Sequence, residues 1–439
     1  MGVLAVYGVP DASTYIYYGL HNLQHRGQEG GGIATFDAHG DSHRYRGLGL
    51  LNEIFNNGQV GKLQGSLGIG CVKYANASRG GLDNVGPFFF RHHSGDFCVA
   101  SDGNLVNSKQ IAEYLEKRGT IFQTDTDAEL LAHLVKKSAN EDRIVNIVKA
   151  LNMMEGGYTF VIMTKNRIYA ARDKYGIKPL CIGKIGGGYV VSSESCAFGI
   201  MGAEFIRDVR PGEIISLDHH GIRSTIFSKF CKHRMCGMEY IYFARPDSDI
   251  DGCNVHAYRK EAGRRLYREC PVEADMVVGV PESSLSAAMG YAEESGIPYE
   301  MGLIKHKYVG RTFIEPVQSM RELGVKMKLS PVYSIVKGKR IVLVDDSIVR
   351  GTTSLKIVRL LREAGATEVH VRIASPMMRF TCHYGVDTST PEELLCSHRT
   401  LEEACAAIVG GAAPFATRFL RSAPGGLVRG PEGAEPHSL

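Results

Sequence analysis

The clearest hydrophobic pattern in the chain is a short apolar run at residues 341–344, rich in β-branched side chains. Such a run predicts a strand that is buried on both faces, as in a parallel sheet. Apolar residues then recur at helical spacing between residues 355 and 361, and Gly365 marks the expected C-terminal end of that helix. The polar residues 345–353 lie between these two elements. The pattern therefore predicts a strand–loop–helix unit.

The loop of this unit carries candidate chemistry. It opens with two carboxylates and continues with mostly small or hydroxyl-bearing residues: Asp345, Asp346, Ser347, Ile348, Val349, Arg350, Gly351, Thr352 and Thr353. A strand–loop–helix directs backbone N–H groups and the positive end of the helix at one point, which suits a phosphate. Adjacent carboxylates suit vicinal hydroxyls or a magnesium ion. The loop is therefore a candidate site for a sugar phosphate, and a generic α/β turn with two solvated aspartates is the alternative.

The remaining pattern divides the chain into three parts. Residues 1–230 predict an α+β domain in which short strands predominate, with helices at 12–24, 130–137 and 144–151. In residues 231–395, predicted strands at 238–243, 274–280, 341–344 and 368–375 alternate with helices at 258–270 and 285–294, which is typical of an α/β domain. Residues 396–439 predict a helix and then a disordered tail rich in glycine and proline.

Composition narrows the class of protein. The 439 residues are 44% hydrophobic and 22% charged, as in an ordinary globular protein. A net charge of +4 gives no support for a nucleic-acid or membrane partner. Eleven cysteines without regular spacing indicate reduced thiols and not a disulfide framework. Since no signal peptide or long apolar span is evident, we expect a cytoplasmic protein.

The loop at 345–354 reads DDSIVRGTTS and resembles the phosphoribosyl diphosphate (PRPP) loop of type I phosphoribosyltransferases, in the form found in amidophosphoribosyltransferases. Further matching segments are CGMEYIYFARPDS at 236–248, PESS at 281–284 and IKHKYVGRTF at 304–313. The resemblance implies that residues 345–353 bind PRPP and that Ser283, Asp345 and Asp346 contact magnesium. It also implies a lid whose Lys305, Lys307 and Arg311 stabilise the leaving pyrophosphate. A solvated basic face is the alternative for these three cations.

Residues 1–230 resemble the N-terminal-nucleophile glutaminase domain of the same family. The matching segments include YYGLHNLQHRGQEGGGIA at 17–34, SDGNLVN at 101–107 and TDTDAELL at 124–131. This resemblance implies an αββα sandwich that precedes the α/β phosphoribosyltransferase domain.

The glutaminase chemistry does not accompany this resemblance. Met1 stands where the family has its nucleophilic cysteine, and Lys73 replaces the arginine that grips the glutamine carboxylate. Asp102-Gly103 replaces an Asn-Gly that forms the oxyanion hole, and a carboxylate there opposes developing negative charge. Arg26 and Asp127 of the family pattern are retained. A substitute nucleophile, Cys71, lies nearby in sequence, but a buried strand cysteine is usually inert.

These features predict an amidophosphoribosyltransferase-like pentosyltransferase that aminates PRPP, the first step of purine biosynthesis, with ammonia and without glutaminase activity. A non-catalytic, PRPP-binding regulatory or partner protein is the alternative. Cys236 and Cys382 fall on only two of the four positions that bind an iron–sulfur cluster in some family members, so magnesium is the only cofactor expected. A homo-oligomer, a dimer or tetramer, and an ammonia-supplying partner are further expectations.

Overall fold

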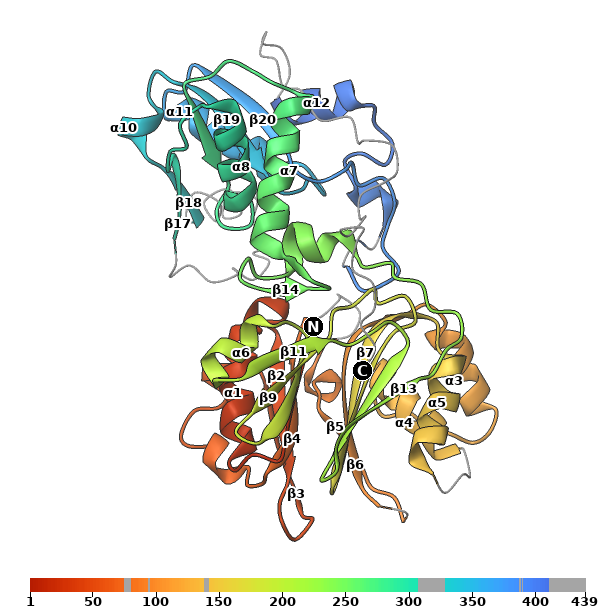
Figure 1. Ribbon diagram of the computed structural model, residues 1–439. Helices are drawn as coiled ribbons and strands as arrows, with labels where there is room; N and C mark the ends of the chain where they lie inside the picture. The colour runs from red at the N-terminus through yellow and green to blue at the C-terminus, as the bar shows by residue number, and fades with distance from the viewer. Residues whose placement is uncertain are drawn as a thin grey trace. The chain divides into compact units, whose positions relative to one another are not determined.

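The computed structural model describes residues 1–74, 80–93, 95–137, 142–306, 328–386, 388 and 390–409 (Figure 1). The chain divides into two compact units. Unit 1 comprises Met1–His256 with Cys382–Asp387, and unit 2 comprises Ala257–Thr381 with Thr388–Leu439. Two of the three cations of the predicted lid, Lys307 and Arg311, and the tail from residue 410 lie outside the described residues.

Unit 1 contains two antiparallel sheets. The first has the strand order β11-β9-β10-β1-β4-β2-β3 and the second has the order β13-β12-β8-β7-β6-β5. The strands of the first are β1 (Gly2–Tyr7), β2 (Gly30–Phe36), β3 (Ser42–Leu48), β4 (Leu67–Lys73), β9 (Cys181–Ile185), β10 (Gly188–Ser192) and β11 (Glu204–Asp208). Those of the second are β5 (Phe88–Phe90), β6 (Phe97–Leu105), β7 (Gly156–Thr164), β8 (Arg167–Arg172), β12 (Glu213–Asp218) and β13 (Gly221–Ile226).

The two sheets pack face to face between helices (Figure 1). Val3, Ile69, Ala100, Val161 and Ile215 belong to the apolar core between the sheets. The outer face of the first sheet is covered by α1 (Ala12–Asn22) and α6 (Cys196–Met201), with the short α2 (Leu51–Ile54) nearby. The outer face of the second sheet is covered by α3 (Ser108–Glu116), α4 (Asp127–Lys137) and α5 (Arg143–Met153). The predicted αββα sandwich is confirmed.

Glycines in β4 allow α1 to lie close to the first sheet. A Cβ atom added at Gly68 or Gly70 would come within 2.7 Å of the Ile16 side chain of α1.

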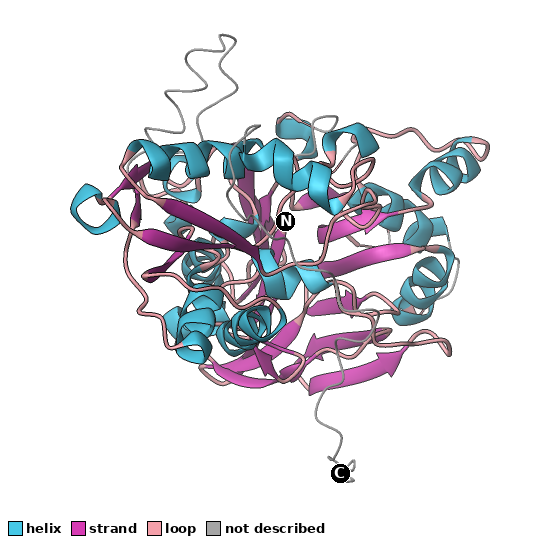
Figure 2. Cartoon of the chain, turned by 90° about the horizontal axis from the view of Figure 1, so that it is seen from above, coloured by secondary structure: helices cyan, strands magenta, loops and turns pink. Residues whose placement is uncertain are grey.

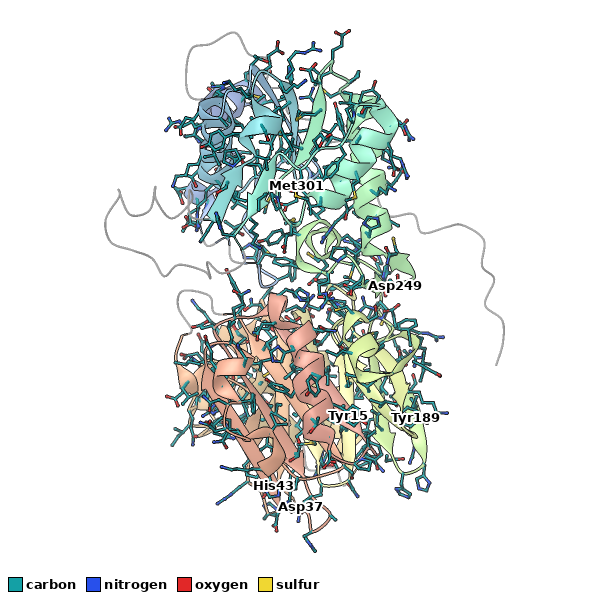
Figure 3. All side chains as sticks on the ribbon, turned by 90° about the vertical axis from the view of Figure 1, so that its left-hand side faces the viewer. Tyr15, Asp37, His43, Tyr189, Asp249 and Met301 are labelled. Atoms are coloured by element: carbon teal, nitrogen blue, oxygen red, sulfur yellow. The ribbon has the colours of Figure 1, made fainter. Side chains whose placement is uncertain are left out.

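At the far end of the same sheet, Asp37 and His43 lie side by side where β2 turns into β3 (Figure 3), with 3.0 Å between His43 Nε2 and Asp37 Oδ2.

The predicted strand at 238–243 is wrong. Glu239–Phe243 forms a π-helical turn, and Ala244 N donates to Glu239 O at 2.9 Å. The aromatic run that follows Glu239 favours a strand on propensity alone. However, Glu239 itself is fully buried and binds Arg26 and Lys178. These charged contacts of Glu239 override the β propensity of the aromatic residues that follow it.

Unit 2 is built on a three-stranded parallel sheet of order β16-β19-β20, with β16 (Met276–Gly279), β19 (Arg340–Asp345) and β20 (Glu368–Ile373). Ile341 and Leu343 face a core shared with α11 (Thr352–Glu363). Val342 and Val344 face the opposite core, shared with α7 (Val255–Glu269) and α8 (Leu285–Ser295). The central strand is therefore buried on both faces, and the predicted α/β domain is confirmed.

The smaller elements of unit 2 flank this sheet. They are β17 (Leu303–Lys305), β18 (Leu329–Pro331), α10 (Tyr333–Val336), the 3-10 turn η5 (Pro391–Glu393) and α12 (Leu401–Val409). Figure 2 distinguishes the helices and strands of both units by colour. Among the described residues, no helix combines the length and the apolar character that crossing a membrane requires.

Candidate functional site

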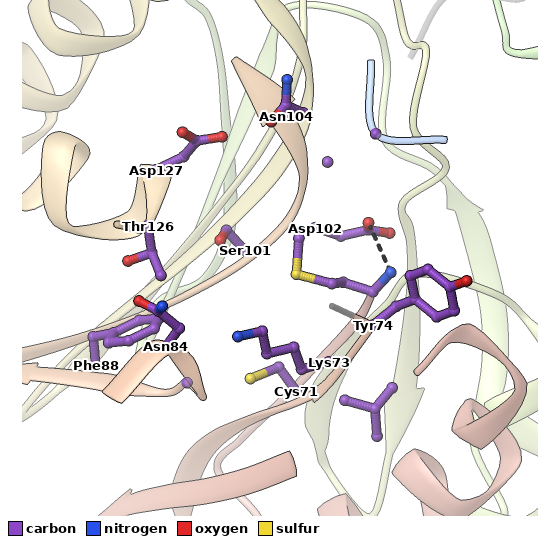
Figure 4. Close-up of a pocket in the computed structure, with 15 residues that line it drawn as sticks. Cys71, Lys73, Tyr74, Asn84, Phe88, Ser101, Asp102, Asn104, Thr126 and Asp127 are labelled. Carbon is purple, nitrogen blue, oxygen red and sulfur yellow. Dashed lines mark ion pairs between the residues drawn. The ribbon is translucent and has the colours of Figure 1, made fainter. Parts of the chain in front are cut away.

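Unit 1 contains a pocket beside residue 1 (Figure 4). Met1, which directly precedes β1, is one of the residues that line the pocket. Strand β4 contributes Cys71 and Lys73, and β6 contributes Asp102. The other lining residues are Val72, Tyr74, Asn84, Gly86, Phe88, Ser101, Gly103, Asn104, Thr126, Asp127 and Gly385. The structure thus brings Met1, Lys73, Asp102, Gly103 and Asp127 together in one pocket, although they come from separate segments of the sequence.

Asp102 is buried and engaged with two cationic groups. Its Oδ1 lies 3.4 Å from the Met1 amine, the ion pair drawn in Figure 4, and its Oδ2 accepts a bond from Arg26 Nη2 at 3.1 Å. Burial alone would raise the pKa of Asp102, but the positive charges of the Met1 amine, Lys178 and Arg26 together lower it to about 2. Asp102 is therefore an ionised carboxylate at neutral pH and has no proton to donate.

Arg26 lies beneath residue 1 and is not among the residues that line the pocket. Its Nε donates to Met1 O at 3.0 Å, and its Nη1 donates to Glu194 at 2.6 Å and to Glu239 at 2.9 Å. Burial disfavours its charge, yet the surrounding carboxylates raise the pKa of Arg26 well above the usual value. The retained arginine therefore fixes the position of residue 1 and holds a buried ionic cluster together.

Three charged members of this cluster were not identified from the sequence: Glu194, Glu239 and Lys178. Glu194 accepts bonds from His25 Nε2 at 2.7 Å and Ser248 Oγ at 2.7 Å as well as from Arg26. Glu239 pairs with Lys178 at 3.2 Å. Despite burial, these opposite charges lower the pKa of Glu194 and Glu239. The one signal in the sequence was a single acid before an aromatic run, at Glu239.

Asp127 and Gly103 define the side of the pocket formed by β6 and α4. Asp127, the first residue of α4, accepts a bond from Leu105 N at 2.9 Å. Gly103 has φ of +113°, and a Cβ atom there would lie 2.0 Å from Gly157 O, so only glycine fits. The backbone conformation of β6 at residue 103 therefore depends on this glycine.

Cys71 lines the pocket but is poorly suited to act as a nucleophile. Its side chain is buried within the apolar core between the sheets. Burial raises the pKa of the Cys71 thiol to about 12, and the nearby Met1 amine and Lys73 offset this only in part. Since the thiolate is the reactive form, Cys71 is essentially unreactive at neutral pH.

The second candidate site lies at the carboxyl end of β19 in unit 2. Asp345 and Asp346 are both buried there. Ser284 Oγ donates to Asp345 Oδ1 at 3.3 Å, Ser347 Oγ donates to Asp346 Oδ1 at 2.6 Å, and Ser283 Oγ contacts Asp346 Oδ2. Burial raises the pKa of both carboxyls, and the adjacent Asp346 raises that of Asp345 further. A cation bound at the pair would stabilise the ionised form that burial disfavours, so the pair favours a cation.

The loop after this pair leads directly into a helix. Ile348 is buried, whereas Arg350, Thr352 and Thr353 are accessible to a ligand. Gly351 precedes the first residue of α11 with φ of +76°, a left-handed conformation that glycine adopts without strain. The N-terminal N–H groups of α11 therefore point toward the same end of the sheet as the two carboxylates.

The lid cation that the structure describes, Lys305, ends β17 and lies 3.6 Å from Glu282. This contact places it beside Ser283 of the PESS turn. No group of three or more His, Cys, Asp or Glu side chains within the described residues could hold a metal ion by itself. A magnesium site at the Asp345–Asp346 pair would therefore need substrate or water oxygens to complete it.

Comparison with known proteins agrees with this arrangement. Residues 84–199 match the family model of a glutamine amidotransferase domain, and residues 259–379 match that of a phosphoribosyl transferase domain. An amidophosphoribosyltransferase of Bacillus subtilis strain 168 is 53% identical over 403 residues, which cover 92% of this chain and 84% of the relative. One from Staphylococcus aureus strain Mu50 is 47% identical over 404 residues, covering 92% and 82%.

Two solved structures have the same fold. The glutamine PRPP amidotransferase of B. subtilis complexed with ADP and GMP aligns with a TM-score of 0.90 at 50% identity, covering 96% of this chain and 91% of that one. A structure described as the allosteric regulatory enzyme of purine biosynthesis aligns with a TM-score of 0.91 at 51% identity, covering 96% and 90%. With this identity over nearly its whole length, the chain belongs to the amidophosphoribosyltransferase family.

Proposed function

We propose that this protein transfers ammonia to C1 of PRPP, forming 5-phosphoribosylamine and pyrophosphate as the first step of purine biosynthesis, and that it does not hydrolyse glutamine. Membership of the amidophosphoribosyltransferase family supports the transfer reaction. The observation that carries the proposal is the buried Asp345–Asp346 pair at the end of β19, followed by an accessible loop and the N-terminus of α11. Carboxylates and helix N–H groups at one sheet edge suit a ribose that bears a 5′-phosphate.

Each part of the site has a role in this reaction. Residues 347–353 hold the 5′-phosphate, and Asp345 and Asp346 orient the ribose hydroxyls. Ammonia attacks C1, the bond from C1 to the pyrophosphate oxygen breaks, and the ammonium product loses a proton. Lys305, with Lys307 and Arg311 outside the described residues, stabilises the negative charge on the leaving pyrophosphate.

Magnesium fits the same site. Asp345, Asp346 and Ser283 would hold it, because two buried carboxylates and a hydroxyl are the hard oxygen ligands that this ion prefers. When bound, it would supply Lewis-acid charge stabilisation to the pyrophosphate. We propose no iron–sulfur cluster, since only Cys236 and Cys382 occupy cluster-ligand positions.

The absence of glutaminase activity rests on three residues of the unit 1 pocket. Met1 offers a thioether where a thiolate is needed, and Lys73 offers a point charge where two parallel hydrogen bonds are needed. Asp102 is an ionised carboxylate where a donor to an oxyanion is needed. Ammonia must then come from solution or from a partner protein.

Pyrophosphate release tests the proposal directly. The purified protein is incubated with PRPP and magnesium, together with either ammonium or glutamine, and pyrophosphate and glutamate are both measured. We expect pyrophosphate with ammonium and neither product with glutamine. Glutamate release that disappears in Cys71→Ala would mean that Cys71 has become the nucleophile. PRPP binding without pyrophosphate under any condition would favour the regulatory alternative.

A further inference from the structure

A segment outside the phosphate loop supports the loop from behind. Leu395 N donates to Val349 O at 2.8 Å. A Cβ atom added at Gly351 would lie 2.8 Å from Leu395 Cδ2, so the loop and this side chain are in close contact. Ile348 and Leu395 also belong to the same apolar core. The shape of the loop is therefore fixed by residues about 45 positions further along the chain.

The same segment carries a carboxylate that binds the loop's one cationic side chain. Arg350 is the only Lys or Arg between residues 345 and 353. Its Nη2 lies 2.9 Å from Glu393 Oε2, with the Arg350 side chain 58% exposed and that of Glu393 35% exposed. Glu393 belongs to the short 3-10 turn η5, whose position is fixed by the neighbouring buried Leu394 and Leu395. The positive charge of Arg350 is therefore balanced by a carboxylate of its own chain.

We propose that Glu393 holds Arg350 through their ion pair and releases it when the 5′-phosphate of PRPP binds, so that the pair acts as an anion gate. The inference rests on the proposed function, in which this loop receives that phosphate. A phosphate and the Glu393 carboxylate compete for one guanidinium, and their like charges repel. Glu393 thus lowers the affinity of the loop for phosphate groups and weakens its occupation by free orthophosphate.

A charge-matched pair of variants tests this gate. Glu393→Gln removes the carboxylate that contacts Arg350, whereas Glu392→Gln removes the same charge from the preceding, exposed residue. The dissociation constants of PRPP with magnesium and of orthophosphate alone are measured by calorimetry. We expect both constants to fall by about two- to five-fold in Glu393→Gln, the size expected for a partly exposed ion pair, and to stay near the wild-type values in Glu392→Gln.

A double-mutant cycle separates the gate from a general packing role. Arg350→Gln should weaken binding of both ligands, and adding Glu393→Gln to it should have a smaller effect than in the wild type, because the guanidinium for which carboxylate and phosphate compete is absent and only their direct repulsion remains. Should Glu393→Gln fail to fold, Glu393→Asp draws the carboxylate back by one methylene and should lower both constants in the same direction. The melting temperature of each variant controls for loss of packing.

Several results would overturn the inference. Weaker PRPP binding in Glu393→Gln would mean that Glu393 orients Arg350 onto the phosphate. Equal effects of the Glu392 and Glu393 variants would mean that the change in net charge, and not the contact with Arg350, alters the affinity. Failure of the wild-type protein to bind PRPP at all is a different outcome, since it contradicts the proposed function and not only the gate.

Discussion

Each unit buries a group of carboxylates, and the two groups are balanced differently. In unit 1, Asp102, Glu194 and Glu239 meet the positive charges of Arg26, Lys178 and the Met1 amine. These contacts lower the pKa of all three acids against the effect of burial. In unit 2, burial raises the pKa of both acids of the candidate site, and hydrogen bonds, with the charge of Arg259 in the case of Asp346, offset this only in part.

The difference separates a structural role from a binding role. A carboxylate whose charge is satisfied within the protein gains little from a ligand, and its removal leaves buried cations without a partner. A buried carboxylate pair without a full counter-charge destabilises the empty protein and gains from an external cation. On this basis we expect the unit 1 acids to hold the fold together and the unit 2 acids to bind a ligand.

The largest expected effect comes from the unit 2 pair. The double substitution of Asn at Asp345 and Asp346 should weaken PRPP binding in the presence of magnesium by at least about 100-fold, because it removes the charge that attracts the cation and the acceptors for the ribose. The melting temperature should not fall, since two repelling buried charges are removed. Calorimetric titration and thermal unfolding measure the two quantities. Undiminished PRPP affinity would show that the substrate lies elsewhere.

The next effect concerns glutamine hydrolysis in unit 1. Met1→Cys alone should remain nearly inactive, because Asp102 still opposes the oxyanion and Lys73 still binds the substrate carboxylate weakly. Loss of a single oxyanion donor already costs roughly 100- to 1,000-fold, and the groups of one catalytic unit act together. Adding Asp102→Asn and Lys73→Arg should therefore be required before glutamate release rises.

Ammonia-dependent pyrophosphate release from PRPP is the control for these glutaminase variants. It should persist in each of them, because the residues proposed for the transfer reaction lie in unit 2. A single Met1→Cys substitution that restored glutamate release to the level of the triple variant would contradict the assignment of Asp102 and Lys73.

The sequence predicted the elements whose pattern is local. The strand at 341–344 was predicted because residues on both of its faces are apolar, and the structure buries both faces as β19. The sequence did not predict the ionic cluster of unit 1. Arg26 pairs with Glu194 and Glu239, which are 168 and 213 residues away, so the burial of these charges depends on tertiary contacts that no local pattern encodes.

The same limit applies to the candidate site residues. Met1, Lys73 and Asp102 were selected because they depart from a family pattern, and that comparison indicates which residue types differ but not what they contact. Asp102 contacts both Arg26 and the Met1 amine, and these contacts arise only in the folded chain. Likewise, the pairing of Arg350 with Glu393 joins the proposed phosphate loop to the turn η5, and the sequence of that turn contains no motif that predicts the contact.

The smallest expected effect is a pH-dependent loss of stability in Asp102→Asn. The folded pKa of Asp102 is about 2, below its ordinary value of 3.8. A carboxyl with a lowered folded pKa stabilises the folded state above its unfolded pKa and loses this contribution as the pH falls toward the folded pKa. At pH 7 the substitution should therefore lower the free energy of unfolding by about 2 kcal/mol.

This difference should shrink as the pH falls from about 4 to about 2, the window between the unfolded and folded pKa values. Thermal unfolding of the wild-type protein and the variant across this range measures it. Asp125→Asn, which removes an exposed carboxyl two residues before Asp127, is the matched control and should have no comparable effect. A difference that stayed constant from pH 7 to pH 2 would mean that the Asn side chain disturbs packing and that the charge of Asp102 contributes little. In that case the unit 1 acids would no longer differ from the unit 2 pair in the way their charge balance indicates.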